Sequence, residues 1–204
     1  MSRAIRADSI SLNRGTRSIV ENFSINIEPG KVLALLGPNG SGKSTIVSAL
    51  AGDIQPTSGG IEFDDRLLQE IPIAELATLR SVSQQHQRFT LAFTLTDLLS
   101  MATVRSGNSQ SIFEAVHALE IENLMARKVT SLSGGEQQRV SIAMALAQET
   151  PYFLLDEPFA AQDVASTARI ARYIQNLAQL GKGILVVAHM NERDLAWCDE
   201  LIQI

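Results

Sequence analysis

Cysteine is almost absent from this sequence. Its 204 residues include a single cysteine, Cys198, which excludes an internal disulfide bond and any zinc site built from several cysteines. We interpret Cys198 as an ordinary buried small residue, and its isolation fits a reducing compartment.

The sequence also lacks an excess of positive charge. It carries 17 basic and 22 acidic side chains, a formal net charge of −5. Because nucleic-acid binding depends on clustered Lys and Arg side chains that neutralise phosphates, we expect no nucleic-acid partner. With 45% hydrophobic and 19% charged residues, the chain can bury enough apolar surface to fold compactly as one large domain, or as a core with one inserted region.

Long apolar runs are missing as well. No run approaches the roughly 18 to 20 residues that cross a bilayer, and the start of the sequence lacks a signal-peptide stretch. We therefore expect a soluble, cytoplasmic chain. Any membrane-spanning part of its assembly would come from another polypeptide.

The order of hydrophobic patterns predicts a mixed architecture. Alternating residues over 5–27 predict antiparallel strands joined by a turn. A continuous apolar run at 31–36 predicts a strand buried on both faces, and a helix is expected at 43–51. Apolar steps of three and four residues over 72–130 predict an inserted, mostly helical region. After this region strands alternate with helices, which predicts a parallel sheet covered on both faces.

A glycine-rich segment follows the first predicted buried strand and fits the pattern G-x-x-x-x-G-K-[ST]. It consists of Gly37, Pro38, Asn39, Gly40, Ser41, Gly42, Lys43, Ser44 and Thr45. Glycines let backbone N–H groups surround a phosphate chain, and the next helix N-terminus adds partial positive charge. Lys43 would reach the outer phosphates, and the Ser44 hydroxyl would hold Mg²⁺. The segment predicts nucleotide binding, against the alternative of a merely tight turn.

A second glycine-rich segment begins a later helix, where Ser133, Gly134 and Gly135 precede Glu136. In the simpler interpretation Ser133 caps the helix and Glu136 suits its dipole. However, paired glycines at a helix N-terminus also leave N–H groups that could receive an anion. One nucleotide needs one phosphate-binding loop, so a second loop in the chain indicates a two-fold dimer in which it completes the partner's site.

Two carboxylates follow the apolar run at 152–155. Asp156 at the end of a parallel strand can reach Mg²⁺ beside a phosphate loop. Glu157 can swing toward the nucleotide where the strand ends, and it is the candidate to orient and deprotonate the attacking water. The alternative is an exposed turn that ends the strand.

His189 closes the next apolar run, 184–188, in the same way. We expect it at the same edge of the sheet, near the γ-phosphate, rather than as a simple polar terminus. Gln84 ends a short run and could contact Mg²⁺ or the water through its amide, with Gln85 and Gln87 as nearby alternatives.

Taken together, GPNGSGKST, a strand-end Gln, LSGGEQQR, YFLLDEP and a strand-end His resemble the nucleotide-binding domain of an ABC transporter over essentially the whole chain. The resemblance implies an α/β P-loop NTPase, with a mostly parallel sheet, an N-terminal antiparallel β region and an inserted α-helical subdomain. We expect one domain, 1–204, with an ATP-binding core at 1–71 and 131–204 and the helical subdomain at 72–130.

The resemblance implies roles for individual residues. Gly37 to Thr45 would be the Walker A loop and Gln84 the Q-loop residue. The segment 133–137, including Gln137, would be the signature that binds a partner's ATP. Asp156 and Glu157 would be the Walker B pair, Asp163 the D-loop acid and His189 the switch histidine.

The sequence departs from the family pattern at several places, one of which is the tolerated variant Glu136, where the signature commonly has Gln. Arg14 stands where an aromatic residue commonly stacks on adenine, and its guanidinium could stack there instead, the alternative being a solvated turn arginine. Gln162 precedes Asp163 where the family usually has Leu, which questions the packing across the dimer. The sequence ends at Ile204, within a segment similar to a strand after which the family usually continues.

By resemblance the chain is an ATP-hydrolysing subunit that binds ATP and Mg²⁺. It would dimerise head to tail, with a homodimer expected, to power a separate membrane permease from the cytoplasmic side of the cell membrane. The segment 80–101 is similar to subunits that serve importers of haem, iron-siderophores or vitamin B12, and residues near Phe89 to Phe93 would contact the permease. An alternative is a soluble ABC-type ATPase that acts on nucleic acid or ribosomes.

Overall fold

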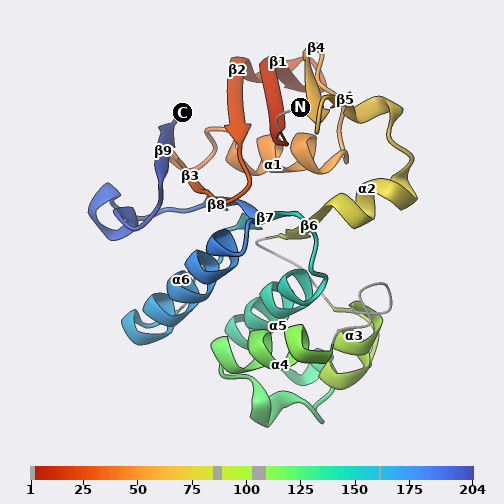
Figure 1. Ribbon diagram of the computed structural model, residues 1–204, viewed down its shortest axis with the longest axis vertical. Helices are drawn as coiled ribbons and strands as arrows, with labels where there is room; N and C mark the ends of the chain where they lie inside the picture. The colour runs from red at the N-terminus through yellow and green to blue at the C-terminus, as the bar shows by residue number, and fades with distance from the viewer. Residues whose placement is uncertain (1–2, 85–88, 103–108, 161) are drawn as a thin grey trace.

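The computed structural model describes residues 3–84, 89–102, 109–160 and 162–204 of the chain. It contains two β-sheets with a helix between them, and a group of helices on the far side of the larger sheet (Figure 1). Among the described residues, the helices are too short or too polar to cross a membrane.

The smaller sheet is antiparallel and comes from the first third of the chain. Its spatial order is β2-β1-β4-β5. These strands are β1 (Ile5–Arg14), β2 (Arg17–Ile27), β4 (Ser58–Phe63) and β5 (Arg66–Leu67). The hairpin expected over 5–27 is confirmed, and a two-residue turn joins β1 to β2.

The larger sheet is parallel throughout, in the order β6-β7-β8-β3-β9. Its strands are β3 (Val32–Leu36), β6 (Arg80–Ser83), β7 (Tyr152–Asp156), β8 (Gly183–Val187) and β9 (Glu200–Gln203). Every residue of β3, β7 and β8 is buried, as continuous apolar runs predict for strands covered on both faces.

In the described ranges, six α-helices accompany the sheets. They are α1 (Lys43–Ala51), α2 (Ile73–Leu79), α3 (Leu95–Ala102), α4 (Ser109–Ala118), α5 (Gly134–Ala147) and α6 (Val164–Gln179). Short 3₁₀ turns lie at Leu68–Glu70, Glu122–Leu124, Val129–Ser131 and Glu192–Leu195. Helix α1 ends at Gly52 in the left-handed conformation, as its sequence predicts.

The two faces of the parallel sheet belong to separate hydrophobic cores. On β3, Leu33 and Leu35 pack with α1 and the antiparallel sheet. The alternate residues Val32, Ala34 and Leu36 pack with α5 and α6. Because successive side chains of a strand point to opposite faces, one apolar strand can support both layers, and α1 lies between the two sheets (Figure 1).

The inserted region is mostly helical, but its first part belongs to the core. Helices α3 and α4 pack with α5 away from the antiparallel sheet (Figure 1). Strand β6, within the expected range 72–130, pairs with β7 in the parallel sheet, and Leu76 of α2 joins the core that contains α1. Four residues are too few for a periodic signal, so the pairing with β7 identifies this strand.

Candidate functional site

The phosphate-loop segment lies between β3 and α1. Gly42 is the N-cap of α1, with φ 103°, and no side chain caps the helix. A Cβ at Gly42 would lie 2.6 Å from Val20 Cγ2, so both conformation and space require glycine here. The first turn of α1 carries no acidic residue. Its N–H groups and dipole are therefore available to an anion.

Lys43 is buried under this loop and is only 5% exposed. Its Nζ donates to the carbonyl oxygens of Gly37 (2.7 Å) and Pro38 (2.9 Å). Burial lowers the pKa of the Lys43 ammonium, and the nearby charges of Glu157 and Asp156 oppose that change. The cation is held at the mouth of the loop, where a phosphate chain would need it.

A cavity of about 540 Å³ opens over the loop. It brings together residues from the loop and α1, the first hairpin, and the ends of β7 and β8. Its lining consists of Arg14, Arg17, Ile19, Asn39, Gly40, Gly42, Lys43, Ser44, Thr45, Glu157 and His189. Residues far apart in the sequence, from Arg14 to His189, therefore line one cavity. This agrees with the expectation that side chains at the carboxyl ends of neighbouring parallel strands meet at one edge of the sheet.

Arg17 is a lining residue that the sequence reasoning missed. It pairs directly with Arg14 across the β1–β2 hairpin, and both side chains are exposed. Like charges at opposed positions are destabilising, and these two face a phosphate loop. The only available signal was the spacing of the two arginines around a two-residue turn.

Asp156 ends β7 and is 4% exposed. Burial raises the pKa of its carboxyl, while the hydrogen bond from the Ser44 side chain lowers it. Within the described part of the chain, Asp156 Oδ1 is buried without a hydrogen-bond partner. A buried carboxylate oxygen in this condition, next to a hydroxyl, is suited to a hard cation such as Mg²⁺.

Glu157 follows in an unusual backbone conformation, with φ 53°. Its N–H donates to the Val187 carbonyl oxygen (2.9 Å), so the chain leaves β7 while still bonded to β8. Glu157 Oε1 lies 3.0 Å from His189 Nε2. A non-glycine residue at positive φ is uncommon and is often found at functional sites.

Gln84 lies at the end of β6 and is exposed. It does not line the cavity described above. The alternatives Gln85 and Gln87 lie outside the described residues.

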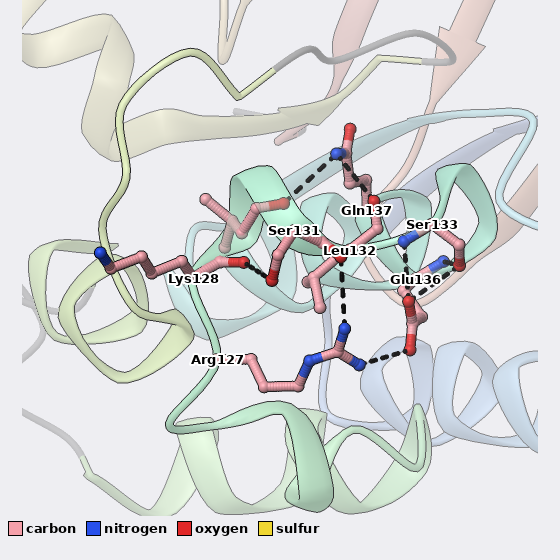
Figure 2. A network of polar contacts seen from close by, with 8 residues as sticks. Arg127, Lys128, Ser131, Leu132, Ser133, Glu136 and Gln137 are labelled. Carbon is pink, nitrogen blue, oxygen red and sulfur yellow. Dashed lines mark hydrogen bonds and ion pairs between the residues drawn. The ribbon is translucent and has the colours of Figure 1, made fainter.

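The second glycine-rich segment forms the N-terminus of α5 (Figure 2). Ser133 is its N-cap in a capping box: Glu136 N donates to Ser133 Oγ (3.4 Å), and Ser133 N donates to Glu136 Oε2 (2.7 Å). A Cβ at Gly134 would meet nothing within 4 Å. The cap that the sequence suggested is therefore present, and the space above Gly134 is open.

None of Ser133, Gly134 and Gly135 lines the cavity over the phosphate loop. Gln137 turns toward its own chain, because its Nε2 donates to the carbonyl oxygens of Val129 and Leu132, each at 3.2 Å. Its side chain holds the preceding turn, and its contact with nucleotide stays a prediction.

Asp163 is the N-cap of α6 and accepts a hydrogen bond from Ser166 N (2.7 Å). That bond holds the pKa of the Asp163 carboxyl below its ordinary value. Gln162 Nε2 donates to the Ala160 carbonyl oxygen (3.3 Å). The acid expected in the D-loop thus orders the start of a helix.

The segment before α3 exposes part of its apolar surface. Leu91 is 64% exposed and Phe93 36% exposed, whereas Phe89 is partly buried against the helical core. The two phenylalanines therefore differ: Phe93 belongs to the surface and Phe89 packs inward.

Comparison with known sequences identifies a family. The profile described as ABC transporter matches residues 20–160. A hemin import ATP-binding protein, HmuV, from Rhodococcus jostii is 36% identical over 205 residues, which cover 97% of this chain and 70% of that protein. HmuV of Thermobifida fusca is 37% identical over 202 residues, which cover 96% and 71%.

Comparison with solved structures gives the same fold. A structure of the ATP-binding subunit of an ABC transporter matches with a TM-score of 0.87 at 22% identity, covering 98% of this chain and 85% of that one. A dimeric structure of a bacterial ABC transporter cassette matches with a TM-score of 0.82 at 25% identity, covering 98% and 94%.

Proposed function

The chain belongs to the ABC transporter family as one of its ATP-binding, ATP-hydrolysing subunits, and we propose that it works as a head-to-tail dimer to power import of haem or a related iron chelate. Its permease would be a separate membrane protein. One observation carries the proposal: the phosphate loop, Glu157 and His189 line a single cavity.

The phosphate chain of ATP would lie over Gly37 to Thr45. The uncapped N-terminus of α1 and the Lys43 ammonium supply positive charge from below. Arg14 and Arg17 face the loop from the hairpin and would contact the base or ribose. A planar guanidinium can stack on a ring, which would replace the aromatic residue that the family commonly has.

Mg²⁺ would be held by Ser44 and Asp156, with Gln84 as a further ligand. The unpartnered Asp156 Oδ1 supports this assignment. Burial that raises the pKa of Asp156 disfavours its charged form unless a cation compensates it. The ion would supply neutralisation of phosphate charge. Residues of this chain would do the rest by placement.

Glu157 would orient the attacking water and accept its proton. Its position at 13% side-chain exposure limits competing solvent, and the His189 ring at 3.0 Å restricts its carboxylate. His189 would in turn face the γ-phosphate. General-base assistance of this kind is worth roughly 10²–10⁴-fold in rate.

The N-terminus of α5 would bind the ATP held by a second subunit. Support comes from the open space over Gly134 and from the absence of Ser133 to Gly135 from their own chain's cavity. A cassette of this fold is known as a dimer. We expect two copies of this chain, with Asp163 and Gln162 near the contact, and no nucleic acid.

Haem is the proposed cargo because the relatives described above are named hemin import proteins. Those names favour transport over the alternative of an ATPase acting on nucleic acid or ribosomes. The exposed Leu91 and Phe93 would contact the permease at the cytoplasmic face of the membrane. Residues 72–130, apart from α2 and β6, would form the helical subdomain.

The test has two parts. In the first, ATP hydrolysis by the purified chain is compared with that of Lys43→Ala, which should lose at least about 100-fold because the loop loses its cation. Hydrolysis at the normal rate in the variant would contradict the assigned site. In the second, the chain is co-purified with its permease in proteoliposomes. ATP-driven haem uptake would support the cargo, and uptake of another solute instead of haem would refute that part alone.

A further inference from the structure

A carboxylate occupies the helix N-terminus that the proposed function assigns to the partner's ATP. Glu136 Oε2 accepts from Ser133 N at 2.7 Å and from Ser133 Oγ at 2.9 Å (Figure 2). Hydrogen bonds from the Ser133 backbone and side chain lower the pKa of Glu136, so this side chain is an anion at neutral pH. It therefore carries negative charge in the first turn of α5.

The same carboxylate has a second partner on the opposite side. Arg127 Nη1 lies 3.2 Å from Glu136 Oε1 (Figure 2). Arg127 Nη2 donates to the Ser131 carbonyl oxygen at 3.2 Å. One guanidinium thus holds both the acidic side chain of the helix and the turn that leads into it.

The backbone of Arg127 is itself fixed by the segment before α3. Leu95 N donates to the Arg127 carbonyl oxygen (3.2 Å), and Val129 N donates to the Phe93 carbonyl oxygen (3.0 Å). Thr94 and Lys128 form an isolated antiparallel bridge between these bonds. These backbone hydrogen bonds hold Arg127 in an extended segment from which its guanidinium reaches Glu136. The Arg127 side chain is 46% exposed.

The ion pair between Arg127 and Glu136 bears on how the N-terminus of α5 could bind a phosphate group. A triphosphate at Gly134 and Gly135 would lie close to the Glu136 carboxylate, and two anions at one helix N-terminus repel each other. The repulsion is relieved if a cation neutralises the carboxylate and draws it aside. Among the ion pairs of the described residues, Arg127 is the positive group that contacts Glu136, while the charge of Arg139 has a smaller effect on the pKa of Glu136.

We propose that Arg127 is a positioning residue for ATP bound across the dimer: it holds and neutralises Glu136 so that Ser133 and the glycine N–H groups can accept the partner's triphosphate. This inference rests on the proposed function. The carboxylate gives up its bonds to Ser133 and keeps Arg127 when the triphosphate arrives. No covalent change is involved.

The experiment removes the positive charge of Arg127, the negative charge of Glu136, and both together. ATP hydrolysis is measured as KM and kcat for the wild type, Arg127→Ala, Glu136→Gln and the double variant. Arg127→Ala should raise KM roughly tenfold, a size typical of coupling within one network. Glu136→Gln is the reference for the double variant, because it changes the capping box by itself. Relative to that reference, the loss of Arg127 should raise KM far less than it does in the wild type, because no charge is left to neutralise.

Two further variants separate charge from shape. Arg127→Lys keeps the charge and should remain close to the wild type, whereas Arg127→Gln should behave like Arg127→Ala. Arg66→Ala is the matched control, because the Arg66 side chain is about as exposed as that of Arg127 and forms an ion pair with Glu75 away from the site. ATP-dependent dimerisation, measured in a Glu157→Gln background, should weaken in the same order as KM rises.

Other outcomes would overturn the inference. A double variant as impaired as Arg127→Ala would mean that Arg127 acts only through the Ser131 carbonyl. A normal KM in Arg127→Ala would mean that Glu136 does not need its ion pair with Arg127. Both results leave the proposed function standing if Lys43→Ala is inactive. A wild type without ATP hydrolysis would instead refute the proposed function and this inference with it.

Discussion

His189 Nε2 lies 3.0 Å from Glu157 Oε1, and this contact joins the ends of β7 and β8 across the mouth of the phosphate-loop cavity. Glu157 reaches this position because its backbone adopts φ 53° directly after the last residue of β7. A residue that continued the strand would direct its side chain into one of the two cores. The backbone turn thus brings the carboxylate to the cavity.

Glu157→Gln should keep ATP binding and lose hydrolysis by about 100-fold or more, since an amide of the same size cannot accept the water's proton. The variant should accumulate as a dimer with ATP and Mg²⁺. Size-exclusion chromatography with light scattering measures this directly. A variant that stays monomeric under saturating ATP would argue against the role of Glu157.

Gly42→Ala should destabilise the fold and the phosphate loop together. The left-handed backbone at φ 103° costs a non-glycine residue about 1–2 kcal/mol, and the added Cβ would contact Val20 Cγ2 at 2.6 Å. Gly40→Ala is the matched control, with φ 79° but open space around its Cβ. Thermal unfolding should show a clearly larger loss for Gly42→Ala, and equal losses would contradict the steric argument.

Asp156→Asn should raise the melting temperature at neutral pH while it abolishes hydrolysis. Burial raises the pKa of Asp156 above its unfolded value, so the folded state binds the proton more tightly. Ionisation of the buried Asp156 therefore destabilises the folded state. This destabilisation is absent below the ordinary Asp pKa of about 4, and it grows as the pH rises through the raised pKa of Asp156. The difference between variant and wild type should therefore shrink on acidification. A difference that is independent of pH would contradict this account.

Ser133→Arg should act on the partner's nucleotide and leave the variant's own phosphate loop intact. A long cation over Gly134 fills the open space that the partner's triphosphate needs. Mixing this variant with Lys43→Ala tests the shared site, because each mixed dimer retains one intact composite site. Partial recovery of hydrolysis in the mixture is expected, and no recovery at any ratio would contradict the head-to-tail arrangement.

Features set by neighbouring residues could be predicted from the sequence. The phosphate loop, the Gly52 end of α1 and the Ser133 cap each depend on a few consecutive residues, and all three are present in the structure. The buried strands could be predicted because continuous apolar runs have few other solutions.

Features set by distant residues could not be predicted in the same way. Arg17 enters the site because the hairpin register places it opposite Arg14. Arg127 meets Glu136 because the 3₁₀ turn between them folds back on α5. Strand β6 belongs to the parallel sheet through its pairing with β7. Each depends on tertiary contacts that no periodicity in the sequence records.

The division of β7 between two cores constrains the carboxylates at its end. Leu154 packs with the layer that contains α1, whereas Phe153 and Leu155 pack with the layer that contains α5. A lengthwise slip of this strand would have to repack both layers at once, and close-packed interiors resist that. Asp156 is therefore anchored at a constant depth beneath the phosphate loop.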